Sequence, residues 1–168
     1  MIDPQDYKQV LGAFPTGVTV VTALDDDGRL VGFTASAFSA VSMDPALVLV
    51  CPSLNSDSYP IIKRSGRFVI HILSHEQQAI AYHFAGKGHD KGQGVQWQRS
   101  ELQNAVLEGA VAYLECRVWE DYPGGDHAIL VGEVEKLWCA GHELDPLLYC
   151  RGKMDQLPET LRALAHAS

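Results

Sequence analysis

The alternation of apolar and polar positions along the chain predicts a protein built mainly of β-strands. Val18 to Leu24 and Ala46 to Cys51 are apolar runs, and Arg67 to Leu73 and Asp126 to Trp138 continue the same pattern. Such runs, rich in β-branched residues and bounded by turn sequences, are typical of strands. Asp25-Asp26-Asp27-Gly28 is one such turn, and it predicts an antiparallel hairpin between the first run and the residues that follow it.

Helices are expected at only a few places. The first begins with Asp3 as N-cap and Pro4 at the first helical position, followed by apolar residues at helical spacing. Three more helices are predicted at residues 59–65, 75–84 and 158–166, and the polar stretch 86–104 is predicted to be a long loop. Many antiparallel strands with few helices indicate a mainly β protein with flanking helices, closed into a small barrel.

Length and composition narrow the class of protein. With 168 residues, of which 46% are hydrophobic, the chain suits one domain spanning residues 1–168. Its longest apolar run is far below the roughly 18 residues of a membrane helix, so we expect a soluble, cytoplasmic protein without membrane contact. A net charge of −8 argues against nucleic acid as a partner. The four cysteines contain no CxxC pair and are expected to be free thiols.

Positive charges gather in three places on this acidic chain, and each is a candidate site for an anionic cofactor. The groups are Lys63, Arg64 and Arg67; Lys87 and Lys91; and Arg151 and Lys153. Clustered cations can bind phosphates even when the net charge is negative. Solvated surface charge is the alternative for each group. The histidines near residue 90 (His75, His83 and His89) have no standard metal-ligand spacing, so no metal site is expected.

A loop rich in hydroxyl groups, Pro52 to Ser58, precedes the helix predicted at residues 59–65. Hydroxyl groups beside a helix start are typical of phosphate sites, because free backbone N–H groups and the helix dipole attract anions there. Ser56 and Ser58 are therefore candidate phosphate ligands. Helix capping is the alternative role, and it is compatible with phosphate binding.

A run of small residues, Thr34, Ala35, Ser36 and Ala37, follows the predicted hairpin. Such a strand leaves its backbone N–H and C=O groups uncovered, so a flat polar ring can approach closely enough to form hydrogen bonds. Cys51 and Ser53 are expected to line the end of the neighbouring strand. The alternative is a small-residue strand that packs beneath a helix.

The segment TASAFSAVSMDP at residues 34–45, followed by an apolar strand, resembles the flavin reductase family. The resemblance continues through PTGVTVVT, SGRFVIHIL, GDHAILVGEV and PLLYCRG, and covers about residues 7–154. It implies a split β-barrel of the FMN-binding type that forms a homodimer and binds flavin at the dimer interface. It also implies an NAD(P)H:flavin oxidoreductase that uses NADH or NADPH to reduce FMN or FAD. A flavin-dependent monooxygenase is the implied partner.

The resemblance also implies where the flavin lies. Ser56 and Ser58 would hold its phosphate, with Ser58 in place of the family's threonine. Phe84, Ala85 and Gly86 resemble the family's loop at the flavin edge. His71 stands where the family usually has asparagine, which leaves the role of His71 open.

Gly125-Asp126-His127 matches the family's Gly-Asp-His motif and opens a predicted strand. The resemblance implies that His127 positions the nicotinamide and that Asp126 orients His127. Tyr149 and Arg151 match the PLLY segment and are expected to close the dinucleotide site. Hydride transfer is chemistry of the cofactors themselves, so no nucleophilic side chain is required.

Two other functions remain open from the sequence. One is an electron-carrying flavoprotein that holds its flavin tightly and turns over NADH slowly. The other is a ligand-binding or dimeric interaction domain that has kept the barrel and lost the flavin site. Departures from the family pattern keep both alternatives open, and they fall at Ser58, His71, Gly92 and Met154.

Overall fold

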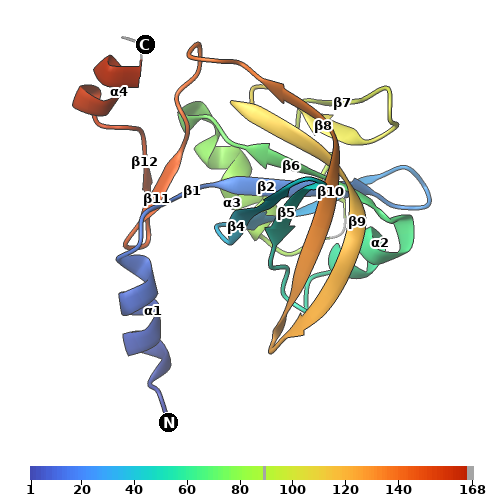
Figure 1. The fold of residues 1–168 in the computed structure, drawn as a ribbon, viewed down its shortest axis with the longest axis horizontal. Helices are drawn as coiled ribbons and strands as arrows, with labels where there is room; N and C mark the ends of the chain where they lie inside the picture. The colour runs from blue at the N-terminus through green and yellow to red at the C-terminus, as the bar shows by residue number, and fades with distance from the viewer. Residues whose placement is uncertain (89, 166–168) are drawn as a thin grey trace.

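The computed structural model describes residues 1–88 and 90–165, and shows a mainly antiparallel β protein with a few helices. Its largest sheet has seven strands in the order β3-β2-β6-β9-β10-β5-β4 (Figure 1). These strands are β2 (Thr19–Leu24), β3 (Leu30–Ala35), β4 (Phe38–Met43), β5 (Ala46–Val50), β6 (Arg67–Ile72), β9 (Ala112–Gly124) and β10 (His127–Cys139). The sequence-based expectation of a mainly β class is confirmed.

Two small sheets and the helices complete the fold. One sheet contains β1 (Thr16–Gly17), β11 (Leu148–Cys150) and β12 (Lys153–Asp155), and the other contains β7 (Trp97–Arg99) and β8 (Ala105–Leu107). The helices are α1 (Pro4–Gly12), α2 (Tyr59–Ser65), the 3₁₀ turn η1 (His75–Gln77), α3 (Gln78–Ala85) and α4 (Glu159–Ala165). The predicted helix end at His166 lies outside the described residues, as does His89. No helix within the described ranges has the length and apolar character needed to cross a membrane.

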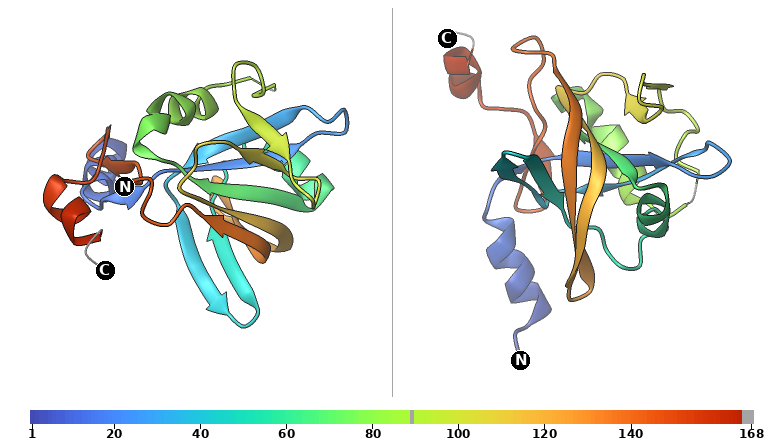
Figure 2. Two further views of the ribbon diagram at one scale, coloured as in Figure 1. Left: turned by 90° about the horizontal axis from the view of Figure 1, so that it is seen from above. Right: turned by 45° about the vertical axis from the view of Figure 1, so that its right-hand side comes forward.

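The large sheet is not closed into a barrel, so that expectation was wrong. The strands β3 and β4 follow each other in the chain, yet they are the two edges of the sheet. Between them the chain turns sharply at Ser36, whose carbonyl accepts a hydrogen bond from the Phe38 N–H at 3.0 Å. The β4–β5 hairpin then diverges from β2 and β3 (Figure 2). The edge of β3 is left without a neighbouring strand.

The strands β2 and β3 lie between two hydrophobic clusters, one on each side of the sheet. One cluster packs against α2, and its members are Val21, Ala23, Val31, Val48, Val50, Ile61, Ile62, Phe68, Ile70, Cys116 and Leu130. The other packs against α3, and its members are Val18, Val20, Leu30, Leu73, Ala81, Phe84, Ala105, Leu107 and Leu147. Burial on both faces fixes the position of these two strands.

His71 on β6 connects the sheet to β8. It is fully buried, its Nε2 accepts a hydrogen bond from the Leu107 N–H at 3.0 Å, and its Nδ1 lies 3.1 Å from the Val20 carbonyl oxygen. Because Nε2 accepts, Nδ1 carries the proton and donates to Val20. Burial lowers the pKa of His71 to about 4, so the ring is neutral near pH 7. The structure therefore gives His71 a structural role.

The helix α1 begins as the sequence predicted. The Asp3 carboxylate accepts hydrogen bonds from the N–H groups of Gln5 and Asp6, at 2.7 and 3.2 Å. None of the helical residues is buried, and the helix lies beside the sheet rather than upon it (Figure 1). The apolar side chains in and just after the helix are exposed, namely Tyr7, Val10, Leu11 and Phe14.

Candidate functional site

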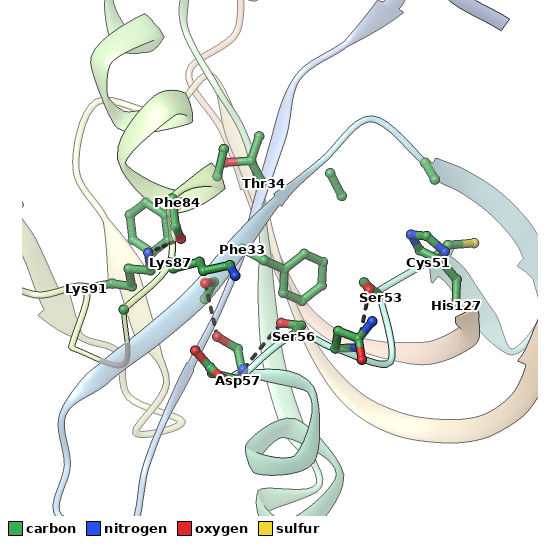
Figure 3. Close-up of a pocket in the computed structure, with 18 of the residues that line it drawn as sticks. Phe33, Thr34, Cys51, Ser53, Ser56, Asp57, Phe84, Lys87, Lys91 and His127 are labelled. Atoms are coloured by element: carbon green, nitrogen blue, oxygen red, sulfur yellow. Dashed lines mark hydrogen bonds between the residues drawn. The ribbon is translucent and has the colours of Figure 1, made fainter. Parts of the chain in front are cut away.

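A cavity of about 430 Å³ lies along the free edge of β3. We call one side of it the sheet wall, formed by residues 32–37 together with Cys51, Ser53 and His127. We call the other side the loop wall, formed by residues 55–58, residues 84–88 and Lys91. Figure 3 shows Cys51 and His127 at one end of the cavity, and Phe84, Lys87 and Lys91 at the other.

The backbone of β3 presents polar groups toward the cavity. The carbonyls of Leu30 and Gly32 point away from β2, because they accept hydrogen bonds from the Lys91 N–H at 2.8 Å and the Ser58 hydroxyl at 3.0 Å. Alternation along an edge strand gives Thr34 the same orientation. Among the described residues, none forms a hydrogen bond with the Thr34 backbone on this side. A planar ligand can therefore bond to the peptide group there.

Gly32 keeps β3 close to its neighbours. A Cβ atom at this position would overlap the Val21 carbonyl oxygen and lie 2.9 Å from Cε1 of Phe84. The ring of Phe84 is itself buried and lines the cavity. Glycine is required at this position by space, so the backbone position of the sheet wall depends on it.

The His127 end is held by hydrogen bonds between two segments that are distant in sequence. The N–H of Leu54 donates to the Asp126 carbonyl at 3.0 Å, and the N–H of Ala128 donates to the Pro52 carbonyl at 2.9 Å. These bonds place Ser53 beside His127 in an antiparallel bridge. Loop and strand therefore fix the backbone position of His127 beside the cavity.

The side chains at this end differ in charge. Nδ1 of His127 lies 2.8 Å from Oδ1 of Asp126, and this hydrogen bond lowers the pKa of the exposed carboxyl group. An acceptor at Nδ1 fixes the orientation of the imidazole. Burial raises the pKa of the Cys51 thiol, so this cysteine is a neutral lining group near pH 7 and not a thiolate nucleophile.

The loop wall is organised around Lys91. Its side chain is 4% exposed, and its ammonium group donates to the carbonyl oxygens of His83 at 3.2 Å and Gly86 at 2.5 Å. Nε2 of His83 in turn lies 3.0 Å from the Lys91 carbonyl oxygen. Burial lowers the pKa of Lys91, and the nearby charge of Asp57 opposes that shift. These contacts fasten the loop to the end of α3.

The two candidate phosphate serines differ in what their hydroxyl groups do. The Ser58 hydroxyl is buried and donates its proton to the Gly32 carbonyl. The Ser56 oxygen accepts a hydrogen bond from the Ser58 N–H at 3.3 Å, which leaves the Ser56 O–H available as a donor. Ser56 is therefore suited to bind a ligand, and Ser58 is suited to join α2 to β3.

Most residues proposed from the sequence meet at this cavity, but three do not. Those at the cavity are Thr34, Ala35, Ser36, Ala37, Cys51, Ser53, Ser56, Ser58, Phe84, Ala85, Gly86 and His127. Asp126 contacts His127 from outside the lining. Tyr149 pairs with Thr16 in the small sheet, and the Arg151 N–H donates to the Gly12 carbonyl at 2.7 Å, so both lie away from the cavity of their own chain.

Sequence reasoning missed several lining residues. These are Gly32, Phe33, Asn55, Asp57, Lys87, Gly88 and Lys91. The sequence carries a signal for two of them, because Lys87 and Lys91 form one of its local groups of positive charge. Within residues 1–88 and 90–165, no three His, Cys, Asp or Glu side chains are grouped so as to hold a metal ion.

Comparison with known families identifies the class of protein to which this fold belongs. Residues 11–158 match the flavin reductase like domain. The match covers most of the chain, so the protein belongs to the flavin reductase like family. The resemblance found in the sequence is thereby confirmed.

Individual relatives are similar over nearly the whole chain. The chain is 41% identical over 152 residues to the reductase subunit HsaB of a flavin-dependent monooxygenase from Mycobacterium tuberculosis, covering 90% of this chain and 81% of the relative. It is 38% identical over 151 residues to a flavin reductase from Pseudomonas putida, covering 90% and 88%. The structure of the Streptomyces globisporus NADH:FAD oxidoreductase SgcE6, in complex with NAD and FAD fragments, superposes with a TM-score of 0.86 at 33% identity, covering 95% and 97%.

Proposed function

We infer that this protein is an NAD(P)H:flavin oxidoreductase that reduces FMN or FAD and supplies the reduced flavin to a partner monooxygenase. Membership of the flavin reductase like family supports this conclusion, as do relatives named as reductase components of two-component monooxygenases. The observation in the structure that carries it is the free edge of β3 at Thr34, where unpaired peptide groups meet a cavity. Such an edge is suited to the polar rim of a flavin ring.

The residues at the cavity suit the parts of a flavin. Within residues 34–37, the backbone N–H groups that point away from β2 would hold the ring edge and stabilise negative charge that develops there. Ser56 would donate a hydrogen bond to the phosphate. The flavin itself, when bound, supplies the chemistry of accepting a hydride from a nicotinamide. His127, held by Asp126, would orient the nicotinamide at the ring face.

Steady-state oxidation of NADH and NADPH by the purified protein, with FMN, FAD or no flavin added, tests the proposal. Rapid oxidation that requires added flavin is the expected result, and the preferred flavin and nucleotide would then be known. A protein that stays yellow on purification and turns over slowly would support an electron carrier. A colourless protein, inert with either flavin, would overturn the proposal.

We propose further that the protein acts as a cytoplasmic homodimer and that each copy is one domain of the FMN-binding type. The exposed apolar side chains of the α1 segment support a dimer, because a contiguous apolar face is normally covered by another surface. In this arrangement Tyr149 and Arg151 would serve the cavity of the second copy. Sedimentation equilibrium tests the dimer, and a monomer at all concentrations would exclude it.

A further inference from the structure

Lys91 presents a fixed positive charge to the cavity. Its side chain is 4% exposed and lines the cavity, which is unusual for lysine. An ammonium group has three N–H donors, and two of them are used by the carbonyl oxygens of His83 and Gly86. The third donor has no hydrogen-bond partner among the described residues. Since the group is already desolvated and held in place, an anion that reaches it gains the interaction at little further cost.

Asp57 places an opposing charge in the same cavity. It lies on the loop wall between Ser56 and Ser58, and its carboxylate is near enough to Lys91 to act on the ammonium charge. Figure 3 shows Asp57 and Lys91 on different segments of the loop wall. Lys87 is the only other lysine or arginine among the lining residues, and its side chain is exposed. Lys91 is therefore the one buried charge among these three lining residues, whereas Asp57 and Lys87 are exposed.

We propose that Lys91 is the cation that receives the flavin phosphate, and that Asp57 limits how tightly this phosphate is held. The proposal rests on the function inferred above and adds a determinant of flavin choice. A phosphate monoester, as in FMN, carries a charge of about −1.5 to −2 near pH 7. Each phosphate of the diphosphate in FAD carries a single charge. Repulsion from Asp57 therefore weakens the binding of FMN more than the binding of FAD. The bound flavin stays exchangeable as a result.

Binding titrations of the whole protein with FMN, FAD and riboflavin test both residues, with quenching of flavin fluorescence as the readout. Lys91→Met keeps most of the side-chain volume and removes the charge. We expect it to lower the affinity for FMN about tenfold and the affinity for riboflavin less than about twofold. Asp57→Asn keeps the shape and removes the opposing charge. We expect it to raise the affinity for FMN about fivefold and the affinity for FAD by less, and to leave the affinity for riboflavin unchanged.

His83→Ala is the matched control, because it removes the imidazole that bonds to the Lys91 carbonyl and leaves the ammonium group in place. We expect His83→Ala to shift the loop without removing the charge. A shift of the loop should lower the affinity for FMN, FAD and riboflavin alike. If Lys91→Met also weakened riboflavin as much as FMN, the residue would be a positioning residue only and the inference would be overturned.

Asp57→Asn keeps the inference testable even if Lys91→Met fails to fold, because Asp57 is exposed. Equal changes in FMN and riboflavin affinity in this variant would overturn the role of Asp57. Failure of the unchanged protein to bind any flavin would instead overturn the proposed function itself.

Discussion

The two walls of the cavity are built on different principles. The sheet wall presents peptide groups, and its shape depends on strands that are buried on both faces. The loop wall presents charged and hydroxyl side chains on segments anchored by a few hydrogen bonds. Changes that move the backbone of the sheet wall should therefore alter the fold and the binding of every flavin. Changes to the ligand-facing charges and hydroxyl groups of the loop wall should alter what the ligand's phosphate contributes.

Gly32→Ala would affect the sheet wall most. The added Cβ would overlap the Val21 carbonyl oxygen, so β2 and β3 must separate or Phe84 must move. We expect the free energy of unfolding to fall by about 3 kcal/mol, together with loss of binding of FMN, FAD and riboflavin alike. Urea denaturation measures the first effect and flavin titration the second.

Gly17→Ala is the matched control, because nothing lies within 4 Å of a Cβ atom at that position. It should leave both measurements nearly unchanged. A Gly32→Ala protein of full stability that still binds flavin would show that the sheet wall is more adaptable than the packing indicates.

Protonation of His71 should loosen the support of the sheet wall. His71 lies in the same row of the sheet as Val20 and Thr34. Its pKa is about 4 in the folded state and about 6.5 when unfolded, so the unfolded chain binds more protons between these values. The stability that the neutral ring contributes is complete above about pH 6.5, and up to about 3 kcal/mol is lost as the pH falls toward 4.

Denaturant unfolding of the unchanged protein and of His71→Asn, at a series of pH values, checks this dependence. The asparagine variant lacks the titrating group, so its stability should vary less over the same range. Parallel curves for the two proteins would show that other groups cause the acid sensitivity.

His127→Ala removes a side chain of the sheet wall without moving its backbone. Because the imidazole is half exposed at the cavity, we expect the KM for NADH to rise about tenfold while flavin affinity changes less than about twofold. Asp126→Asn should act in the same direction and more weakly, since an amide oxygen can still accept from Nδ1. Equal losses of nucleotide and flavin affinity in His127→Ala would contradict the position assigned to the nicotinamide.

The two serines of the loop wall should separate binding from stability. Ser56→Ala should weaken the binding of FMN by about 1 kcal/mol and leave the binding of riboflavin unchanged, because only the phosphate loses a hydrogen-bond donor. Ser58→Ala should instead lower the free energy of unfolding by about 1 kcal/mol, because the Gly32 carbonyl loses its partner. Flavin titration and urea denaturation of both variants check this contrast. A phosphate-specific loss in Ser58→Ala would reverse the two roles.

Local features of the fold were readable from the sequence. The Asp3 cap, the hairpin of β2 and β3 and the helix at 59–65 all depend on neighbouring residues, and each is present as predicted. Such features need no knowledge of distant contacts.

Features that depend on distant contacts were missed. The stretch 86–104, predicted as a long loop, contains β7, which pairs with β8 just beyond it, and β8 is held to the sheet by the hydrogen bond between Leu107 and His71. The barrel was expected to close, but the turn at Ser36 directs β4 to pair with β5 alone. The sequence offered little indication that Lys91 lines the cavity, because its burial depends on hydrogen bonds to carbonyl oxygens at the end of α3. Pattern and composition do not specify these partners.

The unpaired edge of β3 has a consequence for how such proteins diverge. Peptide groups are the same in every residue except proline, so a ring site made from them tolerates many exchanges of side chain, provided that small residues keep the edge open. This agrees with a TM-score of 0.86 to a relative that shares only 33% of its sequence. Selection for another flavin or another partner can then act on the loop wall, where one carboxylate or one ammonium group changes the preference, while the inherited ring site stays intact.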